Sequence, residues 1–430
     1  MKSFLTFMEN HFVPIAAKIG GQRHLVVIRD SFAVAMPLIL VGAFAVLLNG
    51  IWSAFGSGVD AAVRNAVPWL FELNGIVWWG TFAIFSLFMV VSVAYRLAQS
   101  YNEDGLLAGV ISLAAFVMQL PQLREINGDM AWGWITVGDL GITSLFAAII
   151  IAIVITEIYV RLIKMNLTIK LPDSVPPAVS RSFTALIPGA IVLYLAGAVS
   201  LILSKNAITI GGGEINNLIG LIGALLQAPF MTLGQSLWTI LIISLFIPLF
   251  WFTGLHGANI VAPVINAVYL PAVLENANAL QAGLPMPNLW TSVSWDVFVH
   301  FGGAGATLAL IIAIYLVSKR DDYKAIAKIG TAPGVFMINE PVMFGLPVVL
   351  NPYIFIPFVL NPIILTLIAY LATAAGLVPP TSVVVPWTTP PVIGAFLATG
   401  GSVSAAILAA FNFVLAIIMY IPFIILANKR

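Results

Sequence analysis

The sequence predicts an all-α polytopic membrane protein with about ten transmembrane helices and two re-entrant hairpins. Of its 430 residues, 61% are hydrophobic and only 8% are charged, whereas a soluble domain carries about 25% charged residues. The mean hydropathy is +1.06. Apolar runs long enough to cross a bilayer recur along the whole chain. No soluble fold of this size needs so little charge.

The first half of the chain predicts a surface segment followed by five membrane spans. Residues 1–30 are expected to form an amphipathic segment on the cytoplasmic surface. Residues 31–210 then form an N-terminal helical domain, because its apolar runs approach the ~20 residues that a transmembrane helix needs. The expected spans are residues 31–51, 75–97, 106–120, 140–163 and 184–203.

The second half is less regular, and we expect it to form a separate domain over residues 211–430. It begins at the glycine-rich turn Gly211–Glu214. Two later stretches, Ala332–Gly345 and Pro379–Gly401, are rich in Pro and Gly, which interrupt regular helices. They are expected to be re-entrant or interrupted. Continuous spans are expected at residues 236–253, 260–274, 296–317, 352–375 and 403–426.

The basic residues predict the orientation of the chain. With these spans, all 18 Lys and Arg residues except Arg64, Arg124 and Lys205 fall on one side of the membrane. The segment Lys319–Lys328 is expected to be a basic loop on that side. Because basic loops stay in the cytoplasm, both termini are predicted to be cytoplasmic.

Composition also excludes several kinds of chemistry. The chain has no cysteine, which excludes disulfides, thiolate metal sites and cysteine-based covalent catalysis within it. Its four histidines are scattered, so neither a metal site nor another cofactor is expected. The net charge is only +1 and there is no basic arm, so nucleic acid is not an expected partner. Membrane lipid is the surrounding that this composition demands.

The stretch Ala332–Gly345, A-P-G-V-F-M-I-N-E-P-V-M-F-G, contains the first candidate site. Glu340 is the only carboxylate between Asp322 and the C-terminus. A charge at membrane depth costs several kcal/mol, and broken backbone at that depth lines a polar space or is buried in protein. Asn339 beside it supplies a donor and an acceptor. This pair predicts a binding site; the alternative is a carboxylate at the membrane surface.

Four other residues are candidates with open alternatives. His256 follows a long apolar run inside the glycine-flanked break Gly254–Asn259, and it is either a ligand or a helix-packing group. Trp251 and Trp387 lie beside broken polar motifs, where a tryptophan either stacks on the C–H face of a sugar or anchors the chain at the membrane interface. Arg96 ends a span and is a snorkelling arginine by default.

These motifs also carry a family resemblance. A-P-G-V-F-M-I-N-E-P-V-M-F-G-L-P-V-V-L-N-P at residues 332–352 resembles the signature region of the sugar-permease (IIC) component of bacterial phosphotransferase systems. The most similar branch contains the lactose, cellobiose and diacetylchitobiose permeases. G-L-H-G-A-N at 254–259, P-W-T-T-P-P at 386–391 and H-F-V-P-I-A-A-K-I-G-G-Q-R-H-L at 11–25 extend the resemblance over nearly the whole chain.

The resemblance implies a homodimer in the bacterial inner membrane, with ten membrane helices in each subunit. The first five helices would form the dimerisation scaffold, and the second five, with two re-entrant hairpins, would hold the sugar. It implies catalytic roles near the sugar's C6 hydroxyl for Glu340 and His256, and a neighbouring sugar contact for Asn339. It further implies substrate binding by Trp251, Trp387 and Arg96. Met337 departs from the pattern, which more often has a polar residue there.

The implied activity is import of a disaccharide, of cellobiose or diacetylchitobiose type, coupled to its phosphoenolpyruvate-dependent phosphorylation. The phosphoryl donor would be a phosphocysteine on the IIB protein, and since this chain has no cysteine, that donor must be a separate polypeptide. Whether the permease counts as an enzyme in its own right is left open. The alternative is an ion-coupled secondary sugar transporter, which would also use one intramembrane carboxylate. An intramembrane hydrolase would need a nucleophile pair or metal ligands, which the sequence lacks.

Overall fold

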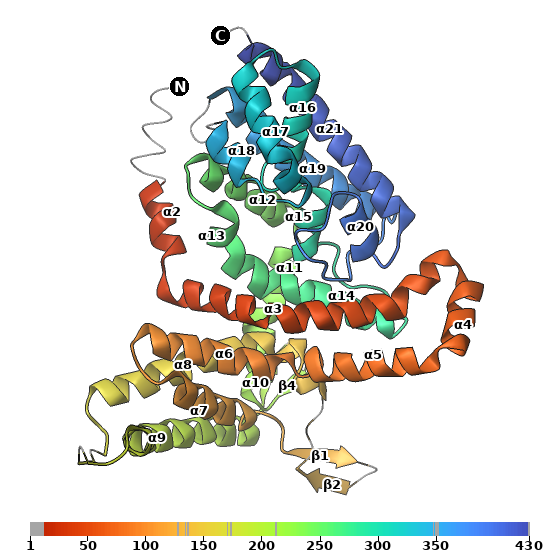
Figure 1. Ribbon diagram of the computed structural model, residues 1–430. Coiled ribbons are helices and arrows are strands. Elements are labelled where there is room, and N and C mark those ends of the chain that lie inside the picture. Colours follow the sequence, from red (N-terminus) through yellow and green to blue (C-terminus); the bar gives the residue numbers. More distant parts are fainter. Residues whose placement is uncertain are drawn as a thin grey trace. The chain divides into compact units, whose positions relative to one another are not determined.

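The computed structural model describes residues 13–126, 129–133, 135, 137–169, 171–172, 174–210, 213–346, 348 and 352–428 (Figure 1). The first twelve residues of the expected N-terminal segment, two glycines of the expected domain boundary and the last two residues lie outside these ranges. Helices dominate the described residues, which confirms the predicted helical class. Strands form two antiparallel hairpins there, β1 (Leu123–Ile126) with β2 (Asp129–Trp132) and β3 (Ile208–Ile210) with β4 (Gly213–Ile215).

The chain folds into two compact units whose segments alternate along the sequence. Unit 1 contains the described residues of Met1–Gly21, Ile39–Trp78 and Met231–Arg430, and unit 2 contains Gln22–Leu38 and Trp79–Phe230. The chain therefore leaves and re-enters each unit. The functional division expected from the sequence, a scaffold up to residue 210 and a sugar-binding domain after it, stays a prediction.

Unit 2 is built around three packed helices, α6 (Phe85–Ser100), α7 (Gly105–Val117) and α8 (Leu145–Lys164). Small residues allow this packing, since a Cβ on Gly109 would lie 3.2 Å from the Val91 side chain. The other helical elements of this part of the chain are α9 (Pro177–Lys205), α10 (Leu218–Ile222), a π-helical turn at Gly223–Gln227, and short 3-10 turns at Val137–Asp139 and Ile142–Ser144.

Unit 1 has a core of four packed helices: α12 (Leu237–Phe252), α16 (Thr307–Val317), α19 (Pro352–Ala374) and α21 (Val403–Ala427). Around it lie shorter helices that carry most of the candidate residues. The remaining elements in this part of the chain are α2 (Val13–Gly20), the end of α3 (Arg23–Gly50), a 3-10 turn (Ile51–Phe55), α4 (Ser57–Ala66), α5 (Pro68–Thr81), α11 (Ala228–Gly234), α13 (Gly257–Val264), a π-helical turn (Ile265–Tyr269), α14 (Leu270–Gln281), α15 (Ser292–Phe298), α17 (Asp321–Val335), α18 (Glu340–Gly345) and α20 (Ile393–Ala398).

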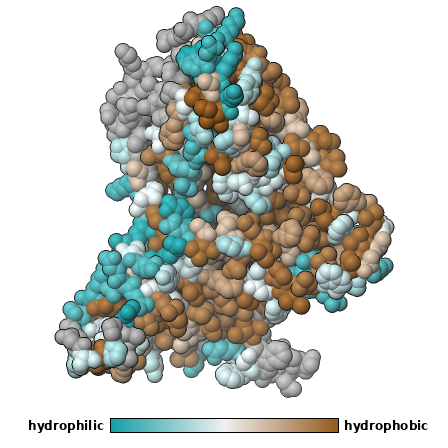
Figure 2. Space-filling view, in the orientation of Figure 1, coloured by the Kyte–Doolittle hydropathy of each residue, from teal (hydrophilic) through white to brown (hydrophobic). Residues whose placement is uncertain are grey.

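The helix α21 shows how a span separates its faces. Its buried face includes Asn412 and Tyr420, both with no exposed surface. Its other face exposes large apolar side chains three or four residues apart, which suits contact with lipid tails. They are Val403, Ile407, Phe411, Val414 and Ile418. Hydrophobic residues cover much of the molecular face in Figure 2 in the same way.

Seven helices among the described residues are long and apolar enough to cross a membrane. A bent pair, Leu218–Gly234 with Leu237–Phe252, turns by 74° and would make an eighth span. Two shorter apolar helices, Gly105–Val117 and Thr307–Val317, fall below that length. These findings support a multi-pass membrane protein. The ten spans, the re-entrant hairpins and the dimer remain predictions.

The continuous span expected at residues 296–317 is wrong. α15 ends at Phe298 and α16 begins only at Thr307. Between them, Gly302, Gly303 and Gly305 have φ of 82°, 103° and 79°, values that glycine adopts without strain. The glycines therefore break the helix. We call residues 299–306 the support loop.

The basic loop expected at Lys319–Lys328 is also wrong in its structure, because α17 begins at Asp321. Asp321 and Asp322 lie in its first turn, where carboxylates are favourable. The Arg320 guanidinium is hydrogen-bonded to Asp322 and holds the pKa of that carboxyl below its usual value. This basic segment is therefore mostly helical and partly neutralised.

Candidate functional site

Asn339 and Glu340 lie at a turn between two helices of unit 1. α17 ends at Val335, and α18 begins at Glu340. Asn339 is only 4% exposed, whereas Glu340 is exposed. Among the described residues, the Glu340 carboxylate has no hydrogen-bond or ion-pair partner, so it is available to a ligand. The turn thus presents one buried amide and one free carboxylate side by side.

The support loop packs against this turn. The Asn339 Nδ2 donates to the Ala304 carbonyl at 3.5 Å, and a Cβ on Gly303 would lie 2.8 Å from the Asn339 Cβ. The Gly302 amide donates to the Met337 sulfur at 3.0 Å. Met337, the position that departs from the family pattern, is buried and has φ of 65°. Its thioether therefore binds the support loop.

His256 is the N-cap residue of α13 and lies at the end of the break that follows α12. Its Nδ1 accepts a hydrogen bond from the Asn259 amide at 3.2 Å, so the proton of the neutral imidazole lies on Nε2. The Trp251 indole packs on the imidazole, with ring centroids 4.3 Å apart. Trp251 is 4% exposed, whereas His256 is exposed. The indole thus holds the imidazole in place, and its own N–H has no partner among the described residues.

Trp387 lies on a separate, proline-rich turn of unit 1. The Thr389 hydroxyl and amide both hydrogen-bond to the Pro386 carbonyl, at 2.7 and 2.9 Å, which closes the turn. The indole is 55% exposed. A half-exposed ring on a closed turn suits either stacking on a sugar or anchoring at the interface.

The structure brings the candidates together in two pairs, Trp251 with His256 and Asn339 with Glu340. Trp387 lies on a third segment of unit 1. Arg96 is partly buried on α6, which belongs to unit 2.

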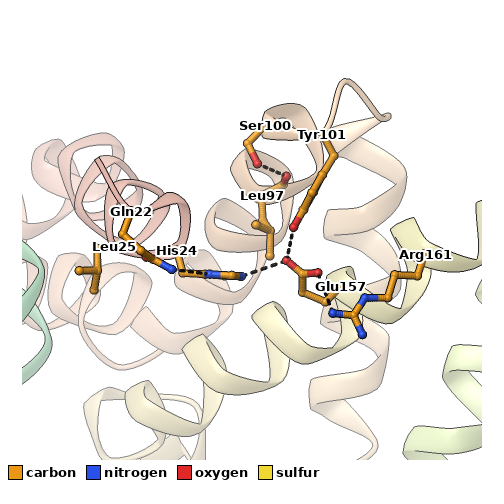
Figure 3. A network of polar contacts seen from close by, with 8 residues as sticks. All are labelled: Gln22, His24, Leu25, Leu97, Ser100, Tyr101, Glu157 and Arg161. Carbon is orange, nitrogen blue, oxygen red and sulfur yellow. Dashed lines mark hydrogen bonds and ion pairs between the residues drawn. The ribbon is translucent and has the colours of Figure 1, made fainter. Parts of the chain in front are cut away.

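Unit 2 contains a polar network that the sequence did not single out (Figure 3). One oxygen of Glu157 accepts hydrogen bonds from the Tyr101 hydroxyl at 2.7 Å and from His24 Nε2 at 2.9 Å. The other oxygen lies 3.8 Å from the Arg161 guanidinium. The Gln22 amide nitrogen donates to His24 Nδ1 at 2.9 Å. The network ties the start of α3 to the ends of α6 and α8.

Three further polar residues near the site were missed from the sequence. His300 lies in the support loop, and its Nε2 is buried without a partner among the described residues. Asn412 and Tyr420 lie inside the apolar α21 and bond to the backbone around the support loop. A signal existed for each, since His300 lies two residues before a glycine run and polar residues within a span are rarely incidental.

In the described part of the chain, no group of three or more His, Cys, Asp or Glu side chains is arranged to hold a metal ion. The candidate residues of the site offer carboxylate, imidazole, amide, indole and guanidinium groups.

Comparisons with known proteins agree over almost the whole chain. Residues 29–362 match the family described as "Phosphotransferase system, EIIC". The cellobiose-specific EIIC component of Lactococcus lactis subsp. lactis (strain IL1403) is 36% identical, over 100% of this chain and 99% of its own length. That of Geobacillus stearothermophilus is 40% identical, over 100% and 95%. The crystal structure of ChbC, the IIC component of the N,N'-diacetylchitobiose-specific system, superposes with a TM-score of 0.91 at 36% identity, covering 98% of each chain.

Proposed function

Because the chain belongs to the EIIC family of the phosphotransferase system, and is thus a multi-pass sugar transporter of that system, we propose that it imports a disaccharide and presents its C6 hydroxyl for phosphorylation. The sugar is of cellobiose or diacetylchitobiose type, the substrates named for its relatives. The observation that carries the proposal is the exposed, unpartnered Glu340 carboxylate beside the buried Asn339 amide among the described residues.

In the proposed reaction, the C6 hydroxyl donates a hydrogen bond to the Glu340 carboxylate. The oxygen attacks phosphorus of a phosphocysteine on IIB, the sulfur–phosphorus bond breaks, and the thiolate leaves on IIB. The hydroxyl proton passes to Glu340. The His256 Nε2–H orients the same oxygen. Phosphoryl transfer depends mostly on positioning, so two groups aimed at one oxygen suit it.

The remaining site residues are proposed to bind the sugar. Asn339 offers an amide to a neighbouring hydroxyl, and Trp387 stacks on a pyranose ring. Trp251 acts at the edge of the site by holding His256. Arg96 supplies guanidinium donors to a polar group of the sugar. These roles follow from residue type and exposure, and from the family resemblance of their motifs.

The phosphorylated IIB protein is proposed to approach from the cytoplasm, where both termini and the basic segments would lie. Lys164–Arg181 and Lys319–Lys328 are the basic segments that suit its docking. The protein is proposed to act as a homodimer with ten spans in each subunit, within the bacterial inner membrane.

Purified protein in sealed vesicles tests this function against ion-coupled transport. With phosphorylated IIB enclosed and no ion gradient, radiolabelled cellobiose or diacetylchitobiose should appear inside as sugar phosphate. A secondary transporter would instead accumulate unmodified sugar when a proton or sodium gradient is imposed. That result would refute the proposal.

The same vesicles test the role of Glu340. Glu340→Gln keeps the size of the side chain and removes the proton acceptor, so the rate of sugar phosphorylation should fall by about a hundredfold or more. Glu214→Gln changes an exposed carboxylate on β4 of unit 2 and should leave the rate unchanged. An active Glu340→Gln variant would remove Glu340 from the mechanism.

A further inference from the structure

The support loop depends on side chains from distant helices. Its backbone lies between two helices of unit 1, so its carbonyls lack regular helical partners, and such groups must be satisfied within the protein at membrane depth. The Tyr420 hydroxyl donates to the Gly305 carbonyl at 2.6 Å. The Asn412 amide donates to the Phe298 carbonyl, just before the loop, at 3.0 Å. Both residues belong to α21.

The support loop is also confined on its other sides. A Cβ on Gly305 would lie 2.2 Å from the Phe358 ring of α19, so the loop backbone lies directly against that helix. On the side of the site, the loop contacts Met337 and Asn339, as described above. Asn339 is therefore connected to α21 through a short, closely packed segment of backbone.

Tyr420 cannot act on a ligand itself, because none of its surface is exposed. We infer that Tyr420 is a positioning residue for the Asn339–Glu340 turn, and that it acts by holding the Gly305 carbonyl of the support loop. The Tyr420 hydroxyl holds the support loop in place. The loop in turn holds the Asn339 amide and the Glu340 carboxylate in the orientation that faces the sugar's C6 hydroxyl. This inference rests on the proposed function for its catalytic consequence, but not for its structural one.

Tyr420→Phe removes only the hydroxyl. The matched control is Tyr269→Phe, because the Tyr269 hydroxyl is also buried and donates to a backbone carbonyl, that of Gly234, at 2.7 Å. Asn412→Leu, nearly the same shape, is a second variant in case Tyr420→Phe does not fold. The chain has no cysteine, so a spin label on Phe344→Cys, at the exposed end of α18, reports the mobility of the turn without interference.

Tyr420→Phe should raise the mobility of the label and lower kcat for sugar phosphorylation about tenfold, with little change in the sugar's Kd. Tyr269→Phe should change neither. The inference is overturned if Tyr420→Phe, or Asn412→Leu in its place, leaves label mobility and kcat per folded molecule at the control's values. If the wild-type protein phosphorylates no sugar, the proposed function fails, while the label still decides whether Tyr420 holds the turn.

Discussion

At the scale of single residues, the candidate site places a buried side chain beside an exposed one in two places. Asn339 is buried and hydrogen-bonded to the support loop, whereas Glu340 is exposed and has no partner in the described part of the chain. His256 and Trp251 repeat the arrangement, with an exposed imidazole on a buried indole. In each pair the buried residue packs beside the exposed one, and we propose that the exposed one contacts the ligand. Such pre-organisation lowers the entropic cost of ordering side chains when a ligand binds.

Trp387 allows a direct test at this scale. If its half-exposed ring stacks on the sugar, Trp387→Ala should weaken sugar binding about tenfold, the upper range for aromatic contacts. Trp238→Ala is the matched control, because Trp238 on α12 is 76% exposed in the same unit. Titration calorimetry with the purified protein measures both Kd values. Equal values for the two variants would instead support interface anchoring by Trp387.

At the scale of elements, the site depends on helix breaks supported by close backbone approach. α12 ends at Phe252, Gly254 has φ of 83°, and α13 restarts at Gly257. A Cβ on Gly257 would overlap the Ile247 carbonyl oxygen. Only glycine lets α13 turn back so tightly against α12, and this turn presents His256.

Gly257→Ala should therefore force the break open. We expect a loss of stability of about 2 kcal/mol or more, typical of overpacking, together with loss of sugar phosphorylation. Gly223→Ala is the control. A Cβ at this position would have no neighbouring atom within 4 Å, and Gly223 lies in a helical turn, where alanine is favourable. Thermal unfolding in detergent measures both. A Gly257→Ala variant as stable as the wild type would contradict the packing argument.

At the scale of the whole molecule, the sequence order and the compact units do not coincide. Each unit is assembled from separated segments, and α3 and α5 contribute residues to both. Only 8% of the residues are charged, and hydrophobic residues cover much of the face shown in Figure 2. The orientation across the membrane is therefore a prediction, which applies the positive-inside rule to the basic residues.

Cysteine labelling tests that orientation, because the natural chain has no cysteine. Trp132→Cys on β2 and Met165→Cys after α8 are at positions 77% and 68% exposed. In intact cells, an impermeant maleimide should label Trp132→Cys, on the outer side, and should label Met165→Cys only after the membrane is broken. The reverse pattern would invert the topology and move the proposed IIB docking side.

The sequence alone determined the class of this protein and the location of its candidate site. So few charged residues are incompatible with a soluble fold. Apolar runs of bilayer length must form helices inside the membrane, because a helix satisfies the backbone hydrogen bonds within the segment. A carboxylate and an amide in a broken apolar stretch indicated the Asn339–Glu340 turn.

Only the tertiary structure decided where the second break lies and what supports the site. A glycine run in an apolar stretch is compatible with a packed helix or with a break. A break is stable only if side chains from elsewhere in the fold hydrogen-bond to the backbone carbonyls that lose their helical partners. Tyr420 bonds to Gly305 across 115 residues of sequence, and Asn412 bonds to Phe298 across 114. A local sequence pattern cannot predict these hydrogen bonds, because they form only when α21 packs beside the support loop.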